Sequence, residues 1–103
     1  MKVFISMPMK GKTDEQIKTE RKAIEEEILL IHPDAEFIDT LITEEYDEKH
    51  SGMLYLAKSI ELLDQADMVY FAKGWESARG CKIEHLVAHE YMNEEENARE
   101  MCS

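Results

Sequence analysis

The stretch DMVYFAKGWESARGCKIE, residues 67–84, decides the fold that the sequence predicts. Its apolar run at 68–72 is rich in strong β-formers and is typical of a strand buried on both faces, as in a parallel sheet. A loop with two glycines follows at 73–80, and a helical pattern runs from about 79 to 91. The pattern predicts that four apolar residues lie near one helix face: Ile83, Leu86, Val87 and Tyr91.

Glu84 is the residue of this stretch that is best placed for chemistry. The pattern predicts it in the first turn of the helix, and in an open α/β sheet ligands bind outside the carboxyl ends of the strands. A carboxylate at a strand–loop–helix junction is therefore a candidate catalytic group. The alternative is that Glu84 only complements the helix dipole, which favours acids in first turns.

The rest of the chain alternates β runs with helical periodicity. Strands are predicted at 2–6 and 35–38, and a helix is predicted to begin near 51. Thr13 and Gln16 have the spacing of a capping box, and the helix that they open is predicted to end before Pro33. The isoleucines of that helix recur at helical spacing: Ile17, Ile24, Ile28 and Ile31.

This order of elements predicts one small α/β domain. The 103 residues fit a single domain at 1–91, with an acidic tail at 92–103 that we interpret as a helix extension or frayed end, not a further strand. Right-handed crossovers give a flavodoxin-like, three-layer fold with a parallel sheet in the order 2-1-3. The acidic segment 39–50 is long for a connection, and such loops are often lids.

Charge and composition exclude several classes of protein. A net charge of −11 argues against a general binder of nucleic-acid polymers or anionic membranes, because the field would repel both. No apolar run approaches the roughly 20 residues that span a bilayer. Cys81 and Cys102 form no CxxC pair, and the sequence shows no signal peptide, so we expect reduced thiols and a cytoplasmic protein.

In the predicted order, strands 1 and 3 are neighbours, so the loops at 6–12 and 73–80 frame the switch-point crevice. Positive charge gathers there, although the protein is acidic. Chance and solubility would account for this, and the alternative is an anionic small ligand such as a phosphate. On or beside the two loops lie five of the twelve basic residues: Lys10, Lys12, Lys73, Arg79 and Lys82.

Three other motifs have competing interpretations. SMPMKGKT resembles the end of a phosphate-binding P-loop, but Ser6 stands where that motif needs glycine and Pro8 has no N–H to offer. His85 and His89 could share a metal, but no third ligand has suitable spacing, so we expect no metal and no cofactor. Trp75 either covers the edge of the core or forms a flat wall for a base.

The segments SMPMKGK, LLDQADMVYF and GCKIE, in this order and spacing, resemble the nucleoside 2-deoxyribosyltransferase-like group over about residues 1–91. The similarity is greatest to its short phage and bacterial branch, which is related to 2'-deoxynucleoside 5'-phosphate N-hydrolases. Glu84, four residues after Gly80, matches the nucleophile of the group. The resemblance implies retaining cleavage or transfer at the N-glycosidic bond of a deoxynucleoside or its 5'-monophosphate.

The resemblance also implies a set of binding residues. Ser6, Met7, Gly11 and Ser59 would line the sugar site, and Lys10, Lys12 and Arg79 the anion site, beside Trp75 and Gly80.

Two features depart from the pattern of the group. Ser59 stands where the group usually has a helper aspartate, and Asp64 is more than a turn away. Glu76 or an acid from 39–50 could substitute. Otherwise the chain would be a non-catalytic nucleotide-binding or sensing module, such as a phage accessory protein. The second departure is that no strand is predicted after the last helix.

We predict a homodimer that packs the helix beginning near 51 against its symmetry mate. Leu54 and Tyr55 lie roughly 100° apart around that helix, so they cannot both face the sheet together with Ile60, and exposed apolar patches of this kind usually mark an interface. Oligomers are also what the resemblance implies. Because the net charge of −11 opposes association, the contact should tighten as salt is raised. Sedimentation that finds a monomer at high micromolar concentration, in both low and high salt, would refute this.

Overall fold

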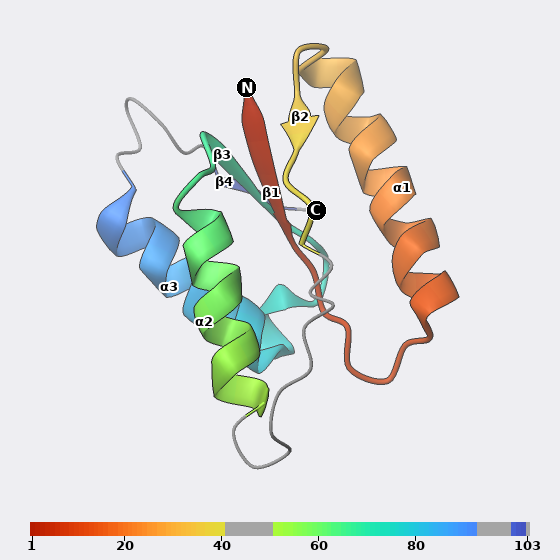
Figure 1. The fold of residues 1–103 in the computed structure, drawn as a ribbon. Coiled ribbons are helices and arrows are strands. Elements are labelled where there is room, and N and C mark those ends of the chain that lie inside the picture. Colours follow the sequence, from red (N-terminus) through yellow and green to blue (C-terminus); the bar gives the residue numbers. More distant parts are fainter. Residues whose placement is uncertain (41–50, 93–99, 103) are drawn as a thin grey trace.

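A parallel sheet lies between two layers of helices in the computed structural model of the chain, which describes residues 1–40, 51–92 and 100–102 (Figure 1). The strand order is β2-β1-β3-β4, and every pairing is parallel. The sheet therefore contains the predicted 2-1-3 order of a small flavodoxin-like domain. The strands are β1 (Lys2–Ser6), β2 (Glu36–Phe37), β3 (Met68–Phe71) and β4 (Glu100–Cys102).

The pairing of β1 with β3 forms the centre of the sheet. It runs in register from Val3 opposite Met68 to Ser6 opposite Phe71. All four residues of β3, and all of β1 after Lys2, are buried. The continuous apolar runs of these strands are explained by this position, because neither face of either strand meets water.

The helices divide between the two faces of the sheet, as Figure 1 shows. One face is covered by α1 (Asp14–Ile31), and the other by α2 (Ser51–Leu63) and α3 (Arg79–Tyr91). Alternate residues of each strand join different cores, since side chains alternate across a strand. Val3 and Ile5 pack with Ile28 of α1, whereas Phe4 packs with Leu63 of α2.

The predicted start of α1 is confirmed. The Thr13 hydroxyl accepts a hydrogen bond from the backbone N–H of Gln16 (3.1 Å), and the Gln16 side chain accepts one from the backbone N–H of Thr13 (2.9 Å). At the other end the helix stops at Ile31, with His32 as its C-cap before Pro33. Both ends therefore follow from local sequence, as capping and proline rules predict.

The predicted inner face of α3 is wrong for two of its four residues, since Ile83 and Val87 are half-buried and Val87 packs against the core. Leu86 and Tyr91 are exposed, and the residues that the helix buries are Cys81, Glu84 and Ala88. Glu84 is the sixth residue of α3, so it lies in the second turn and not in the first. The dipole effect falls off within the first turn, so helix-dipole complementation does not account for Glu84.

The prediction that no strand follows the last helix is also wrong. Residues 100–102 form β4, which pairs with β3 through Val69↔Glu100, Tyr70↔Met101 and Phe71↔Cys102. The rest of the predicted tail, apart from Met92, and the acidic segment after Thr40 lie outside the described residues.

The two loops that were predicted to frame the crevice lie against each other. The backbone N–H of Ala72 donates to the carbonyl of Ser6 (2.9 Å), which continues the pairing of β1 with β3 by one residue. Gly74 has φ +91°, and a Cβ on it would lie 3.6 Å from Cγ of Pro8. Only glycine takes this conformation without strain, so Gly74 fixes the turn after β3 beside the loop after β1.

Apolar residues remain exposed on α2. The exposed fractions are 77% for Met53, 39% for Leu54 and 37% for Tyr55. This is the surface on which the homodimer was predicted, and the homodimer stays a prediction. Among the described helices, none combines the length and the apolar character that a membrane span requires.

We predict that Ile28→Ala will destabilise the protein by about 2–5 kcal/mol, because it opens a cavity beneath α1 at a fully buried position. Ile31→Ala is the matched control: it removes the same atoms from the same helix at a position that is 59% exposed, and should cost less than about 0.5 kcal/mol. Urea unfolding measures both. Equal losses in the two variants would contradict the packing described here.

Candidate functional site

A buried carboxylate lies at the carboxyl end of the central strands. Glu84 is 7% exposed, and its Oε1 accepts a hydrogen bond of 3.0 Å from the hydroxyl of Ser6, which is 1% exposed. Ser6 is the last residue of β1, and Glu84 comes from α3, which follows β3. The bond therefore joins the two adjacent strand–helix units at the switch point, where α/β proteins place their ligands.

Burial raises the pKa of Glu84 to about 7, from an ordinary value of 4.5, because loss of water disfavours the charged carboxylate. The Ser6 hydrogen bond acts in the opposite direction and lowers this pKa, because it stabilises the charged form. Near neutral pH, Glu84 is therefore present in both its protonated and its ionised form. Such poise near the working pH is typical of groups that take part in chemistry, although structural networks also produce it.

Cys81 is the third polar group of this cluster. It is 4% exposed and lies one turn before Glu84 on α3. Burial has the largest effect on the Cys81 thiol and raises its pKa, because loss of water disfavours the thiolate. A hydrogen bond from Ser6 lowers this pKa. The negative charge of Glu84 raises it, and the positive charge of Lys12 lowers it. The arrangement favours a neutral thiol beside the carboxylate.

Trp75 belongs to a cluster of three rings. Its ring stacks on His85 with centroids 4.1 Å apart and an interplanar angle of 11°. Phe71 contacts both, at centroid distances of 5.4 Å from Trp75 and 4.8 Å from His85. Trp75 thus packs on the edge of the core. That it forms a wall for a base stays a prediction.

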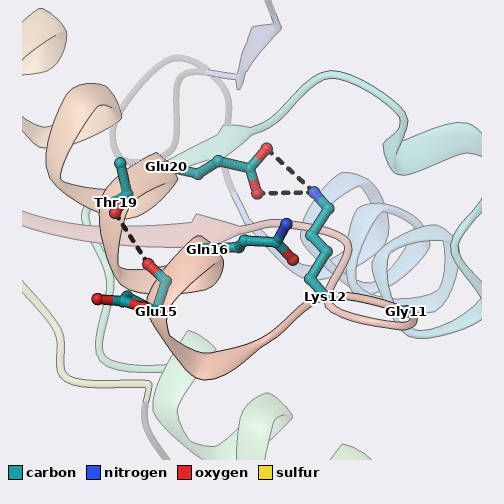
Figure 2. A pocket seen from close by; sticks show the side chains of 6 residues that line it. All are labelled: Gly11, Lys12, Glu15, Gln16, Thr19 and Glu20. Carbon is teal, nitrogen blue, oxygen red and sulfur yellow. Dashed lines mark hydrogen bonds and ion pairs between the residues drawn. The ribbon is translucent and has the colours of Figure 1, made fainter.

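Lys12, predicted in the anion site, is paired with an acid. Its Nζ lies 2.7 Å and 3.1 Å from the two carboxylate oxygens of Glu20 (Figure 2). The pair lies at a pocket of about 510 Å³ whose lining residues do not include Ser6 or Glu84. The ion pair between Lys12 and Glu20 would have to open before Lys12 could bind a phosphate. The pocket is lined by Gly11, Lys12, Glu15, Gln16, Thr19 and Glu20.

The other predicted binding residues lie around these groups. Met7 is buried in the core beneath α1, so it supports the loop after β1. Lys10, Gly11, Arg79 and Gly80 are exposed, and Gly11 has φ +82°.

Two of the predicted binding residues, Arg79 and Ser59, lie beside or on α2. A Cβ added to Gly52 would lie 3.8 Å from a guanidinium nitrogen of Arg79, which places Arg79 at the start of α2. Ser59 is half-buried on α2. Glu76, named as a substitute for the helper carboxylate, is exposed in the short 3-10 helix Trp75–Ser77.

Sequence reasoning missed the roles of two residues. The sequence predicts Cys81 only as a reduced thiol, although its position three residues before Glu84 places both on one helix face. It offers His85 as a possible metal ligand, whereas the ring of His85 stacks on Trp75. Within the described ranges, no three acidic, histidine or cysteine side chains gather as a metal site would require.

We predict that the free energy of unfolding of the wild-type protein, minus that of Glu84→Gln, falls by about 3 kcal/mol as the pH rises from 4.5 to 7. The pKa of Glu84 is higher in the folded state than in the unfolded state. Folding therefore gains from its protonation below pH 4.5, and loses that gain as the pH rises to about 7. Urea titrations across this range measure the difference.

The glutamine keeps an acceptor for Ser6 but cannot ionise, so other carboxylates cancel in the comparison. Glu90→Gln, at an exposed position of the same helix, should follow the wild type. A difference between wild type and Glu84→Gln that does not change with pH would contradict the burial of an ionisable Glu84.

Comparison with known proteins places the chain in a family but finds no individual relative. No curated protein and no solved structure matches the chain. Residues 1–94 match the family described as "Domain of unknown function (DUF4406)". This match covers β1 through α3, and so includes Ser6, Cys81 and Glu84. The chain therefore belongs to the DUF4406 family.

Proposed function

We propose that the protein cleaves or transfers at the N-glycosidic bond of a deoxynucleoside or its 5'-monophosphate, with Glu84 as the nucleophile. The observation that carries the proposal is the buried Glu84 carboxylate, hydrogen-bonded to Ser6 at the switch point between β1 and β3. A buried carboxylate is costly to fold, so its retention in a ligand-binding position favours a chemical role.

In the first step, an oxygen of ionised Glu84 attacks the anomeric carbon of the sugar. The bond from that carbon to the base nitrogen breaks, and the base leaves with the electron pair and takes a proton from solvent. In the second step, water or another base attacks the same carbon and loses a proton to solvent, while the bond from that carbon to Glu84 breaks and releases the carboxylate. The configuration is retained because two displacements occur.

Ser6 has a direct part in this scheme. Its hydroxyl stabilises the ionised form of Glu84, which is the form that attacks. It also fixes which carboxylate oxygen is bonded, because the hydrogen bond is made to Oε1 and leaves Oε2 for the sugar carbon. Ser6 therefore acts on the nucleophile itself, as well as lining the sugar site.

Substrate binding would use the surroundings of this pair. Arg79, exposed at the first position of α3, and Lys10, exposed in the loop after β1, are available for an anionic group. Lys12 would contribute after leaving Glu20. The Trp75–His85 stack offers a flat apolar surface of the kind on which a base stacks.

A second candidate is a nucleotide-binding module without turnover, such as a phage accessory protein. Ser59 favours it, because a hydroxyl cannot supply the second carboxylate that the resemblance calls for. The raised pKa of Glu84 also favours it, since a protonated carboxyl is a poor nucleophile. Binding of a nucleotide without release of free base would support this candidate against the enzyme.

We predict that Glu84→Gln abolishes release of free base from a panel of deoxynucleosides and their 5'-monophosphates, with a loss of several orders of magnitude in rate. An amide is a poor nucleophile of nearly the same size, so the fold should persist. In the wild type the rate should rise with pH as Glu84 ionises at about pH 7. Chromatography of the released base measures both effects, and Glu90→Gln is the control for charge. An unchanged rate in Glu84→Gln would remove Glu84 from the mechanism.

A further inference from the structure

Glu20 holds the ammonium group of Lys12. Both carboxylate oxygens of Glu20 lie within hydrogen-bond distance of Lys12 Nζ, at 2.7 Å and 3.1 Å (Figure 2). The side chains are 29% exposed for Lys12 and 49% for Glu20, so the pair is partly shielded from water. Lys12 comes from the loop after β1 and Glu20 from α1, so the contact joins two elements and does not follow from the spacing of neighbours on one helix.

The backbone that carries Lys12 is fixed on both sides. The backbone N–H of Lys12 donates to the carbonyl of Met9 (3.2 Å), which closes a turn, and Gly11 within this turn has φ +82°. Residues other than glycine rarely adopt that conformation. On the other side, Thr13 belongs to the capping box of α1. Lys12 therefore leaves the backbone at a fixed point, and the position of its amine depends on the partner that the side chain bonds.

The pair borders the pocket of about 510 Å³ that the loop after β1 and the first turns of α1 form. Two other lining side chains already have partners: Gln16 serves the capping box, and the Thr19 hydroxyl donates to the backbone carbonyl of Glu15 (2.9 Å). Among the described residues that line the pocket, Lys12 alone is cationic. Any attraction of the pocket for anions therefore depends on Lys12, and Glu20 occupies that lysine.

We propose that Glu20 is an internal competitor for Lys12: its carboxylate takes the place of an anionic group, and an anionic ligand binds the lysine only by displacing Glu20. A lysine ammonium has three donors and no acceptor, so a second anion must share these donors with the first. A phosphate monoester carries about −1.5 to −2 charges near neutral pH and three strong acceptor oxygens, more than a carboxylate offers. A phosphate group is therefore the class of anion that displaces Glu20.

The competition makes Glu20 a determinant of specificity. It lowers the affinity of the pocket for anions and leaves neutral ligands unaffected, because they do not use the ammonium. The positive charge of Lys12 also lowers the pKa of the Cys81 thiol, one turn before Glu84, so the lysine acts on the α3 residues of the site. That the displacing anion is the 5'-phosphate of a nucleotide rests on the function proposed above, whereas the competition itself does not.

The test is a titration of ¹⁵N-labelled protein with inorganic phosphate, followed by NMR through the backbone amide of Gly11, which lines the pocket. Glu20→Gln keeps the size of the side chain and removes the competing charge, so it should lower the Kd for phosphate about 2–5-fold. Glu15→Gln is the matched control. It removes the same charge from the same pocket but leaves the Lys12–Glu20 pair in place, and should change the Kd by less than about twofold.

The same variants in a Lys12→Gln background separate competition from charge repulsion. Without the ammonium, Glu20 withholds nothing, so Glu20→Gln should change the Kd no more than Glu15→Gln does. If the Lys12→Gln protein binds no phosphate, failure of the added Glu20→Gln to restore binding supports the proposal. An equal gain from Glu20→Gln with and without Lys12 would overturn it, as would absence of phosphate binding in both the wild type and Glu20→Gln.

Deoxynucleosides and their 5'-monophosphates connect the competition to the proposed substrate. Glu20→Gln should tighten the binding of the monophosphates about 2–5-fold and leave that of the neutral deoxynucleosides unchanged. An equal gain for the charged and the neutral ligands would contradict the proposal. Absence of base release by the wild type would refute the proposed function and leave the titration with inorganic phosphate as a valid test of the competition.

Discussion

Double-sided burial of the β1–β3 pair is the constraint on which the rest of the structure depends. Each strand must present apolar side chains on both faces, so one layer of helices cannot complete the core. Helix α1 covers one face, and α2 with α3 covers the other. The opposite exits of α1 and α3 then follow, and they make a switch point at the ends of the two strands, where Ser6 and Phe71 pair.

Glu84 is the exception that this packing tolerates. It occupies a position on α3 that an apolar residue would fill in a purely structural helix, beside the buried Ala88. Its desolvation is offset in part by a single hydroxyl, and no side-chain polar atom buried in the described part of the chain lacks a hydrogen-bond partner. The site is therefore satisfied in hydrogen bonding but not in charge, a condition that suits a group whose charge changes during a reaction.

The sequence predicted the sheet order, the three helices and the position of Glu84 near the carboxyl ends of the central strands, because these depend on local periodicity, caps and crossover handedness. It did not predict which face of α3 is buried. Leu86 and Tyr91 are more apolar than Cys81 and Glu84, and only packing of α3 in the tertiary structure reverses their order of burial. The cluster of Ser6, Cys81 and Glu84 brings Ser6 beside two residues that lie 75 or more positions later in the chain, and no local sequence pattern indicates such a contact. β4 escaped prediction because a three-residue strand forms through pairing with β3, not through intrinsic preference.

The position of β4 bears on where the folding unit ends. The family match stops at residue 94, whereas the backbone of β3 is paired on its outer side by residues 100–102. A sheet edge made of four buried apolar residues, with free N–H and C=O groups, is a template for association with other chains. Cutting the chain at residue 94 would turn β3, whose four residues are all buried, into such an edge. The family match thus ends at residue 94, whereas the backbone pairing of the sheet extends to residue 102. A shortened chain that keeps residues 100–102 keeps the edge of β3 covered and so avoids this route to aggregation.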